Sequence, residues 1–122
     1  VGIVLISHSQ KAAEGAVELA RMRRLMRLLP LRGLEDGSLG TSFEKITAAV
    51  EAVDQGDGVA CIMDMGSAVM TADVAESLDD RQIQLLDCPF VEGAVIAAIE
   101  AAGGTPLAAM QDKVEASRDR KL

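Results

Sequence analysis

The sequence predicts a single α/β domain over residues 1–122, with three layers, α/β/α, around a central, mostly parallel sheet. Two aliphatic runs, residues 2–6 and 59–63, show no polar alternation, which indicates strands covered on both faces. Stretches with helical periodicity separate and follow these runs. Strands that alternate with amphipathic helices are typical of βαβ units, whose right-handed crossovers place helices on both faces of a parallel sheet. A length of 122 residues with 49% hydrophobic side chains suits one domain with its own core.

Five helices are expected. In four of them apolar residues recur every three or four positions, and the fifth should begin at Pro106. We expect the N-cap of the second helix at Thr41 or Ser42, because hydroxyl side chains accept hydrogen bonds from the N–H groups of a first helical turn. The predicted inward-facing residues are Ala13, Ala16, Val17 and Ala20; Phe43, Ile46, Val50 and Val53; Ala68, Ala72 and Ala75; and Val91, Val95, Ala98 and Ala102.

Two further strands are expected at residues 28–31 and 83–86. Pro30 has no N–H group to donate to a neighbouring strand, so the strand that contains it should lie at an edge of the sheet or be irregular at that point. Gly33, Gly37 and Gly40 indicate a turn-rich connection between that strand and the next helix.

Composition and charge exclude several classes of partner. The chain has 19 acidic and 12 basic side chains, a net charge of −7, so nucleic acid and anionic membrane surfaces would be repelled. Trp and Tyr are absent, which removes the usual stacking platforms for single-stranded nucleic acid. The apolar run at the start of the chain is too short to span a membrane, so we expect a cytoplasmic protein.

No metal or cofactor of the protein's own is expected. Cys61 and Cys88 lack the nearby Cys or His residues that zinc sites require, and we expect both to be reduced, buried thiols. The segment GLEDGSLGTS lacks the lysine that ends a P-loop, and no GxGxxG motif follows the first strand. These two absences argue against a nucleotide-binding site.

The candidate site lies where the first and third strands end. His8, the one histidine of the chain, follows the first strand, and Asp64, Gly66 and Ser67 follow the third. Ligands of parallel sheets bind at the carboxyl ends of the strands, where helix N-termini also favour anions. The Asp64 carboxylate can accept one imidazole N–H of His8 and leave the other nitrogen as a nucleophile. Gly66 permits close approach of the backbone, and Ser67 can cap a helix and contact an anion.

The same residues also permit a plain structural interpretation. His8 can be a solvated loop residue, and Asp64 and Ser67 can be ordinary residues at the start of a helix. The spacing of these residues alone does not choose between the two interpretations.

Four sequence blocks in a fixed order strengthen the chemical interpretation. ISHSQKAAEGAVELA, GLEDGSLGTSF, MDMGSAVMTADVA and CPFVEGAVIAA together resemble the DhaM subunits of phosphotransferase-system-dependent dihydroxyacetone kinases, which are mannose-type IIA phosphocarriers. The resemblance covers nearly the whole chain and implies an α/β homodimer. By position, it implies that His8 is the phosphorylated histidine, that Asp64 is the acidic residue beside it, and that Gly66 and Ser67 line the site. Ser9 and Thr41 lie in matching blocks.

The resemblance also implies the partners of such a phosphotransferase subunit. His8 would receive a phosphoryl group from the phosphocarrier protein HPr, itself charged through enzyme I from phosphoenolpyruvate. Phospho-His8 would then rephosphorylate ADP held by the DhaL subunit, which acts with DhaK on dihydroxyacetone. We expect metal-independent transfer, with any magnesium belonging to the ADP-bearing partner.

Two alternatives stay open at this point. The chain can be the IIA domain of a mannose-type sugar transporter, which would donate to a IIB domain, although the MDMGSA segment favours the DhaM group. It can also be a non-catalytic interaction domain in which His8 is never modified.

Overall fold

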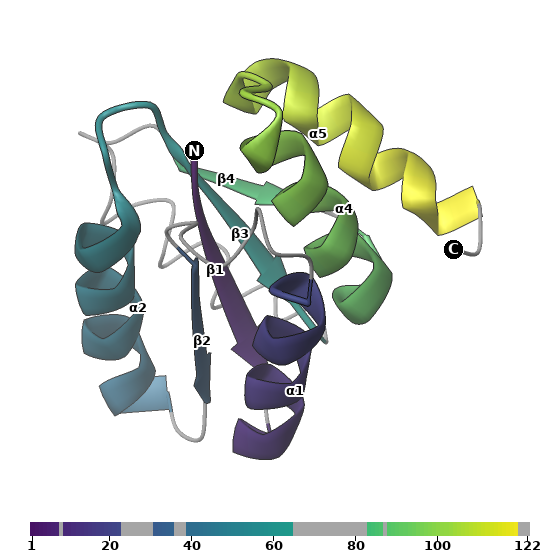
Figure 1. Cartoon of the computed structure of the whole chain (residues 1–122). Helices are drawn as coiled ribbons and strands as arrows, with labels where there is room; N and C mark the ends of the chain where they lie inside the picture. The colour runs from purple at the N-terminus through teal and green to yellow at the C-terminus, as the bar shows by residue number, and fades with distance from the viewer. Residues whose placement is uncertain (8, 23–30, 36–38, 65–82, 87, 120–122) are drawn as a thin grey trace.

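A four-stranded parallel sheet forms the centre of the computed structural model, which describes residues 1–7, 9–22, 31–35, 39–64, 83–86 and 88–119 (Figure 1). Its order is β2-β1-β3-β4. All three neighbouring pairs are parallel, which confirms the predicted sheet. The strands are β1 (Gly2–Ser7), β2 (Leu31–Glu35), β3 (Val59–Met63) and β4 (Ile83–Leu86).

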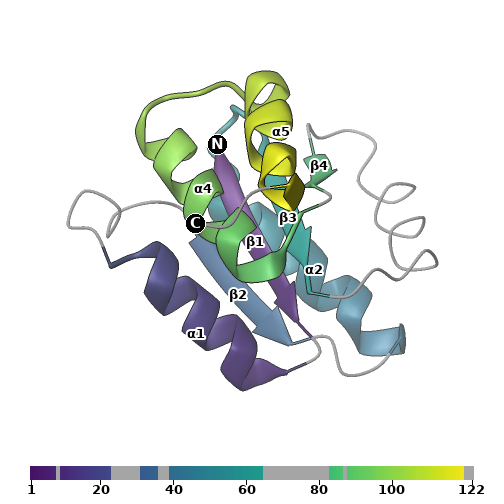
Figure 2. The same ribbon diagram turned by 90° about the vertical axis from the view of Figure 1, so that its right-hand side faces the viewer.

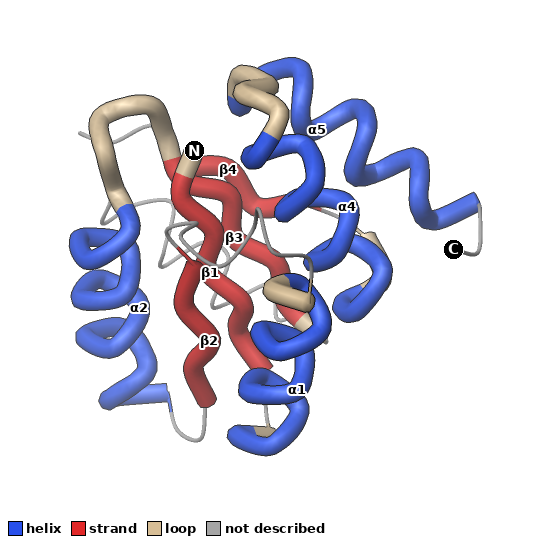
Figure 3. The backbone as a smooth tube through the Cα atoms, viewed as in Figure 1, coloured by secondary structure: helices blue, strands red, loops and turns tan. Residues whose placement is uncertain are grey.

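Helices cover both faces of the sheet. The helix α2 lies on one face, and α1 and α4 lie on the other, with α5 beyond α4 (Figures 1 and 2). Figure 3 shows the strands as a middle layer between these helices. The α-helices are α1 (Gln10–Ala20), α2 (Leu39–Val53), α4 (Phe90–Ala102) and α5 (Leu107–Glu115), and a 3-10 turn, η2 (Ala116–Asp119), follows. The predicted α/β/α layering is confirmed.

The central strand β1 is buried on both faces. Ile3 and Leu5 belong to the core under α1 and α4, whereas Val4 and Ile6 belong to the core under α2. Successive side chains of a strand point to opposite faces, so a strand between two helical layers needs apolar residues at every position. The unbroken aliphatic run therefore reflects its place in the middle of the molecule.

The predicted inward faces of α1 and α2 are confirmed where the structure describes them, whereas the one predicted for α4 is confirmed only at Ala98. On α4 the buried residues are Gly93, Ala94, Ala97 and Ala98. Val91 is 40% exposed, and Ala102 is also exposed. Because α4 is apolar almost all round, periodicity does not mark its inner face. Small side chains face the sheet, where they permit close helix packing.

The second strand begins later than predicted. β2 occupies Leu31–Glu35 instead of residues 28–31, of which 28–30 lie outside the described residues, and Gly33 lies inside the strand. The strand does lie at an end of the described sheet. At Gly33 an added Cβ would lie 2.9 Å from the Ala13 carbonyl oxygen, so this glycine permits α1 to pack closely on β2.

The second helix begins earlier than predicted, because α2 already includes Leu39. Thr41 and Ser42 are therefore inside its first turn, and the predicted N-cap is wrong. Several cap-competent residues precede this helix in the sequence, and residue type alone does not choose among them. The helix predicted around Ala68, Ala72 and Ala75 lies outside the described residues.

The two cysteines differ in environment. Cys61 on β3 is fully buried under α2, and burial raises the pKa of its thiol to about 12. Cys88 is only partly buried, which corrects the prediction that both thiols are buried. Neither cysteine forms a disulfide.

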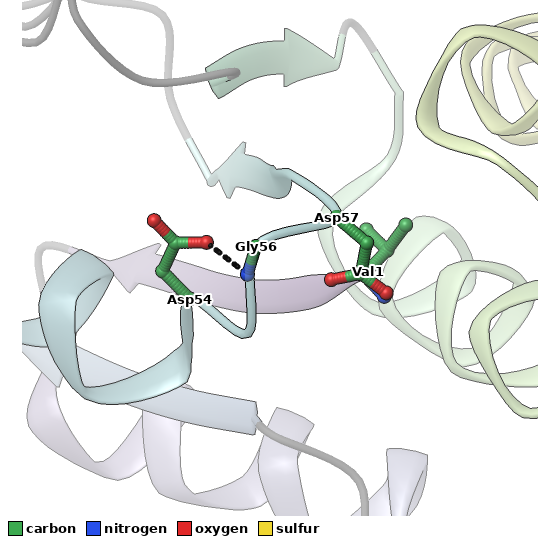
Figure 4. A network of polar contacts seen from close by, with 4 residues as sticks. All are labelled: Val1, Asp54, Gly56 and Asp57. Atoms are coloured by element: carbon green, nitrogen blue, oxygen red, sulfur yellow. Dashed lines mark hydrogen bonds and ion pairs between the residues drawn. The ribbon is translucent and has the colours of Figure 1, made fainter.

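The amino ends of β1 and β3 meet at a polar turn (Figure 4). The Asp54 Oδ1 atom accepts a hydrogen bond of 2.9 Å from the Gly56 N–H group, and Gly56 has a φ of 91°, which favours glycine. The Val1 ammonium lies 2.5 Å from Asp57 Oδ2 and lowers the pKa of that carboxyl by hydrogen bonding. This turn lies at the end of the sheet opposite the candidate site (Figure 1).

Candidate functional site

The carboxyl ends of β1 and β3 lie side by side. Ile6 is paired with Met63, the last residue of β3. The next residue, Asp64, donates its backbone N–H to the Ile6 carbonyl at 3.1 Å, which extends the strand pairing by one residue. Asp64 therefore lies at the end of β1, as the parallel pairing of the two strands predicts.

A side-chain hydrogen bond also joins the two strand ends. The Ser7 hydroxyl donates to Asp64 Oδ2 at 2.8 Å, and it accepts the Ser9 N–H at 3.0 Å. Ser7 is 0% exposed, and Asp64 is partly buried. A hydrogen bond to a carboxylate is stronger than one between neutral groups, above all away from water. The carboxylate is thus held at the residue that precedes His8.

The first helix starts at the same edge. Ser9 is the N-cap of α1, has extended backbone angles, and accepts the Ala12 N–H on its side chain at 3.3 Å. A helix N-terminus presents further backbone N–H groups and a partial positive charge, both of which stabilise an anion. The arrangement suits a phosphoryl group held near the end of β1.

Three of the six sequence-predicted site residues, Ser9, Thr41 and Asp64, lie among the described residues. Asp64 lies at the expected edge, bonded to the last residue of β1. Thr41 lies in the first turn of α2, and the amino end of α2 is at the same edge of the sheet (Figure 1). His8, Gly66 and Ser67 lie outside the described residues, so their roles stay predictions.

Sequence reasoning missed Ser7. A signal was present, because Ser7 ends a strand whose other side chains are aliphatic, and a buried hydroxyl needs a hydrogen-bond partner. What the sequence does not show is which group, 57 positions away, satisfies it.

No group of three or more His, Cys, Asp or Glu side chains in the described part of the chain is arranged to hold a metal ion. Among the described helices, none has the length and apolar character needed to cross a bilayer.

Comparison with known proteins gives consistent sequence matches. The family model EIIA-man, described as the PTS system fructose IIA component, matches residues 2–111. The DhaM phosphotransferase subunit of the PTS-dependent dihydroxyacetone kinase from Lactococcus lactis is 32% identical over 115 residues, 93% of this chain and 93% of that protein. The DhaM phosphoryl donor subunit of PEP-dependent dihydroxyacetone kinase 1 from Listeria innocua is 33% identical, over 81% of this chain and 80% of its own length. The Escherichia coli DhaM phosphoryl donor subunit is 35% identical over 88% of this chain and 25% of its own length.

Solved structures share the fold. The crystal structure of EF1359, a protein of unknown function, superposes with a TM-score of 0.74 at 28% identity and covers 94% of this chain and 92% of its own. That of a sigma-54 interaction domain protein from Enterococcus faecalis superposes with a TM-score of 0.75 at 16% identity, over 98% of this chain and 90% of its own. At that identity the second match concerns the fold alone.

Proposed function

The chain belongs to the EIIA-man family of phosphotransferase-system IIA components, and within it to the DhaM group, and on that premise we propose that it is a phosphohistidine carrier. In this proposal His8 accepts a phosphoryl group from HPr and passes it to ADP bound on DhaL. DhaL then acts with DhaK to phosphorylate dihydroxyacetone. The carrier itself binds no sugar.

The observation that supports this proposal best is the Ser7–Asp64 hydrogen bond. It fixes a carboxylate at the end of β1, one residue before His8 in the chain. A carboxylate in that place can accept one imidazole N–H and so direct the lone pair of the other nitrogen outward. Because the carboxylate is already held, little reorganisation is needed at the moment of transfer.

The chemistry consists of two in-line transfers. In the first, a P–N bond of phospho-HPr breaks as a P–N bond to His8 forms. In the second, that bond breaks as a terminal phosphate oxygen of ADP attacks the phosphorus, giving ATP on DhaL. The amino end of α1, capped by Ser9, would stabilise the phosphoryl oxygens between the two steps.

A labelling experiment tests the proposal. The chain is incubated with enzyme I, HPr and phosphoenolpyruvate labelled with ³²P, and we expect acid-labile label on the wild type and none on His8→Ala. Wild-type chain that takes up no label, or His8→Ala that retains it, would contradict the assignment of His8.

A chase then identifies the acceptor. Labelled chain is mixed with DhaL containing ADP, and separately with a IIB domain of a mannose-type transporter. We expect the label to move to DhaL and to appear in dihydroxyacetone phosphate when DhaK and dihydroxyacetone are added. Transfer to the IIB domain alone would assign the chain to sugar transport.

The oligomeric state and the cellular location are also proposals. We propose a homodimer that works in the cytoplasm, as the DhaM resemblance implies. Light scattering on the eluting chain should give twice the mass of one chain, and cell fractionation should recover it with other cytoplasmic proteins. A monomeric mass or recovery with membranes would contradict these two statements.

A further inference from the structure

Ser7 is a buried polar residue at the end of an otherwise aliphatic strand. Ile3, Val4, Leu5 and Ile6 fill the two cores, whereas the Ser7 hydroxyl, on a side chain with no exposed surface, lies at the carboxyl edge. A buried hydroxyl contributes nothing to the hydrophobic core, and it is tolerated only where partners satisfy it. Its two partners therefore indicate its function.

The direction of both hydrogen bonds follows from the chemistry of the groups. A backbone N–H can only donate and an ionised carboxylate can only accept, so the Ser7 hydroxyl accepts from Ser9 and donates to Asp64 Oδ2. The Ser7 hydroxyl thus connects the backbone of Ser9, the residue after His8 in the chain, with the carboxylate of Asp64 at the end of β3. Its single proton is used for Asp64.

The backbone contact of Asp64 alone does not orient its carboxylate. The Asp64 N–H bond to the Ile6 carbonyl fixes the main chain but leaves the side-chain torsions to be set by other contacts. The Ser7 bond supplies such a contact on Oδ2. An ionised carboxylate has acceptor sites for several hydrogen bonds, so the bond from Ser7 is compatible with one from an imidazole N–H.

We infer that Ser7 is a positioning residue for phosphoryl transfer, whose buried hydroxyl holds the Asp64 carboxylate in the orientation that orients the His8 imidazole. The inference rests on the proposed function, in which His8 is the phosphoryl acceptor. Ser7 acts through Asp64 and does not itself contact the phosphoryl group. Groups that orient a reactive residue in this way affect the rate through geometry.

The test compares Ser7→Ala with the wild type in two measurements. The first is the initial rate of HPr-dependent phosphorylation, which we expect to fall about tenfold or more, the usual effect of losing a hydrogen bond to a charged group. The second is the tautomer ratio of unphosphorylated His8, from ¹⁵N NMR of the neutral imidazole. We expect one tautomer to dominate in the wild type and a mixture in Ser7→Ala, because the Asp64 carboxylate is no longer held.

A second buried serine provides the matched control. Ser117 in η2 is 3% exposed, and its hydroxyl donates to the Val114 carbonyl at 2.6 Å, a partner in its own helical segment. Ser117→Ala should lose a comparable amount of stability and keep the wild-type rate and tautomer ratio. Ser7→Thr, which restores a hydroxyl, should recover most of the rate.

The outcomes separate this inference from the proposed function. Label that is absent from the wild type, or that survives in His8→Ala, overturns the function. Normal labelling of His8 together with a wild-type rate and tautomer ratio in Ser7→Ala overturns the positioning role alone. If Ser7→Ala does not fold, Ser7→Cys keeps most of the volume with a weaker donor and must show the same two changes for the inference to stand.

Discussion

The Asp64 backbone N–H donates to the Ile6 carbonyl, and its side chain accepts a hydrogen bond from the Ser7 hydroxyl. Asp64→Asn keeps an oxygen that can accept from Ser7 but removes the negative charge. We expect the rate of phosphorylation by HPr to fall about 10- to 100-fold, because hydrogen bonds to charged groups contribute roughly 1.5–3 kcal/mol and each 1.36 kcal/mol corresponds to about tenfold in rate. Initial rates of label uptake at pH 7 measure this effect. An Asp64→Asn rate equal to that of the wild type would remove the carboxylate from the mechanism.

Cys61 should make the stability of the fold depend on pH in the alkaline range. Burial raises the pKa of its thiol to about 12, whereas the pKa of a thiol in an unfolded chain is about 8.5. The neutral Cys61 thiol therefore makes its full contribution to the free energy of unfolding below about pH 8.5. This contribution is lost as the pH rises towards 12, by up to about 1.4 kcal/mol per pH unit. Urea unfolding of the wild type and Cys61→Ala at pH 8, 9 and 10 gives the free energy of unfolding at each pH. The two proteins should differ in how steeply this free energy falls as the pH rises.

Cys88→Ala is the control for this measurement, since Cys88 is only partly buried. In Cys88→Ala the free energy of unfolding should fall with rising pH as it does in the wild type. In Cys61→Ala the part of this fall that is due to the buried thiol should be lost. Contributions from groups that are the same in all three proteins cancel in the comparison. Equal slopes in the wild type and Cys61→Ala would show that burial of this thiol does not control the alkaline loss of stability.

At the scale of elements, two glycines should respond in opposite ways to the same substitution. A Cβ at Gly33 in β2 would lie 2.9 Å from the Ala13 carbonyl oxygen and 2.8 Å from Val17 Cγ2, both on α1. Val17 can move, but the helix backbone cannot move cheaply, so Gly33→Ala should destabilise the protein by about 1–3 kcal/mol. At Gly15 in α1 nothing lies within 4 Å, and Gly15→Ala should stabilise it by about 0.5–1 kcal/mol.

Chemical denaturation gives the free energy of unfolding of each variant, which we expect to be lower than that of the wild type for Gly33→Ala and higher for Gly15→Ala. If Gly33→Ala is as stable as the wild type, the close approach of α1 to β2 does not limit side-chain size at residue 33. Loss of stability in Gly15→Ala would instead indicate that the exposed face of α1 is covered by something in solution.

The contact of Gly33 with α1 explains why the second strand was misplaced from sequence. The apolar residues at 28–31 favour a strand locally, and Gly33 favours a turn. In the structure β2 extends over Gly33 because a residue without a side chain suits the crossing of α1. That reason involves Ala13 and Val17, which are distant in the sequence. By contrast, β1 and β3 were predictable, because each is an unbroken aliphatic run, which indicates a strand buried on both faces.

The site shows the same division between local and distant information. The place of Asp64 at the end of β1 follows from the pairing of two recognisable parallel strands, so sequence reasoning could find it. The role of Ser7 depends on a hydrogen bond across 57 positions, and no local pattern identifies its partner. Strand ends are thus predictable as sites, whereas the groups that orient their residues depend on tertiary contacts.

At the scale of the whole molecule, the candidate site lies at the carboxyl ends of the two inner strands of the described sheet. β1 and β3 pair with each other and are covered by α2 on one face and by α1 and α4 on the other. A carrier must present its phosphoryl group to two different partners in the same geometry. Under the proposed function, rigid support of Asp64 by these strands serves that need, because small displacements of reacting groups strongly reduce the rate of transfer.

This arrangement predicts a gradient of local stability across the sheet. The residues of β1 from Gly2 to Ser7 are all buried, whereas Ile83, Gln84 and Leu85 of β4 are only partly buried at an end of the described sheet. Amide hydrogens of β1 and β3 should therefore exchange only through global unfolding, and those of β4 at least about tenfold faster, through local opening. Native-state hydrogen exchange followed by NMR, with urea added stepwise, distinguishes the two routes. Exchange from β1 as fast as from β4 would mean that the strands under the site open locally, and the rigid support inferred for Asp64 would then be wrong.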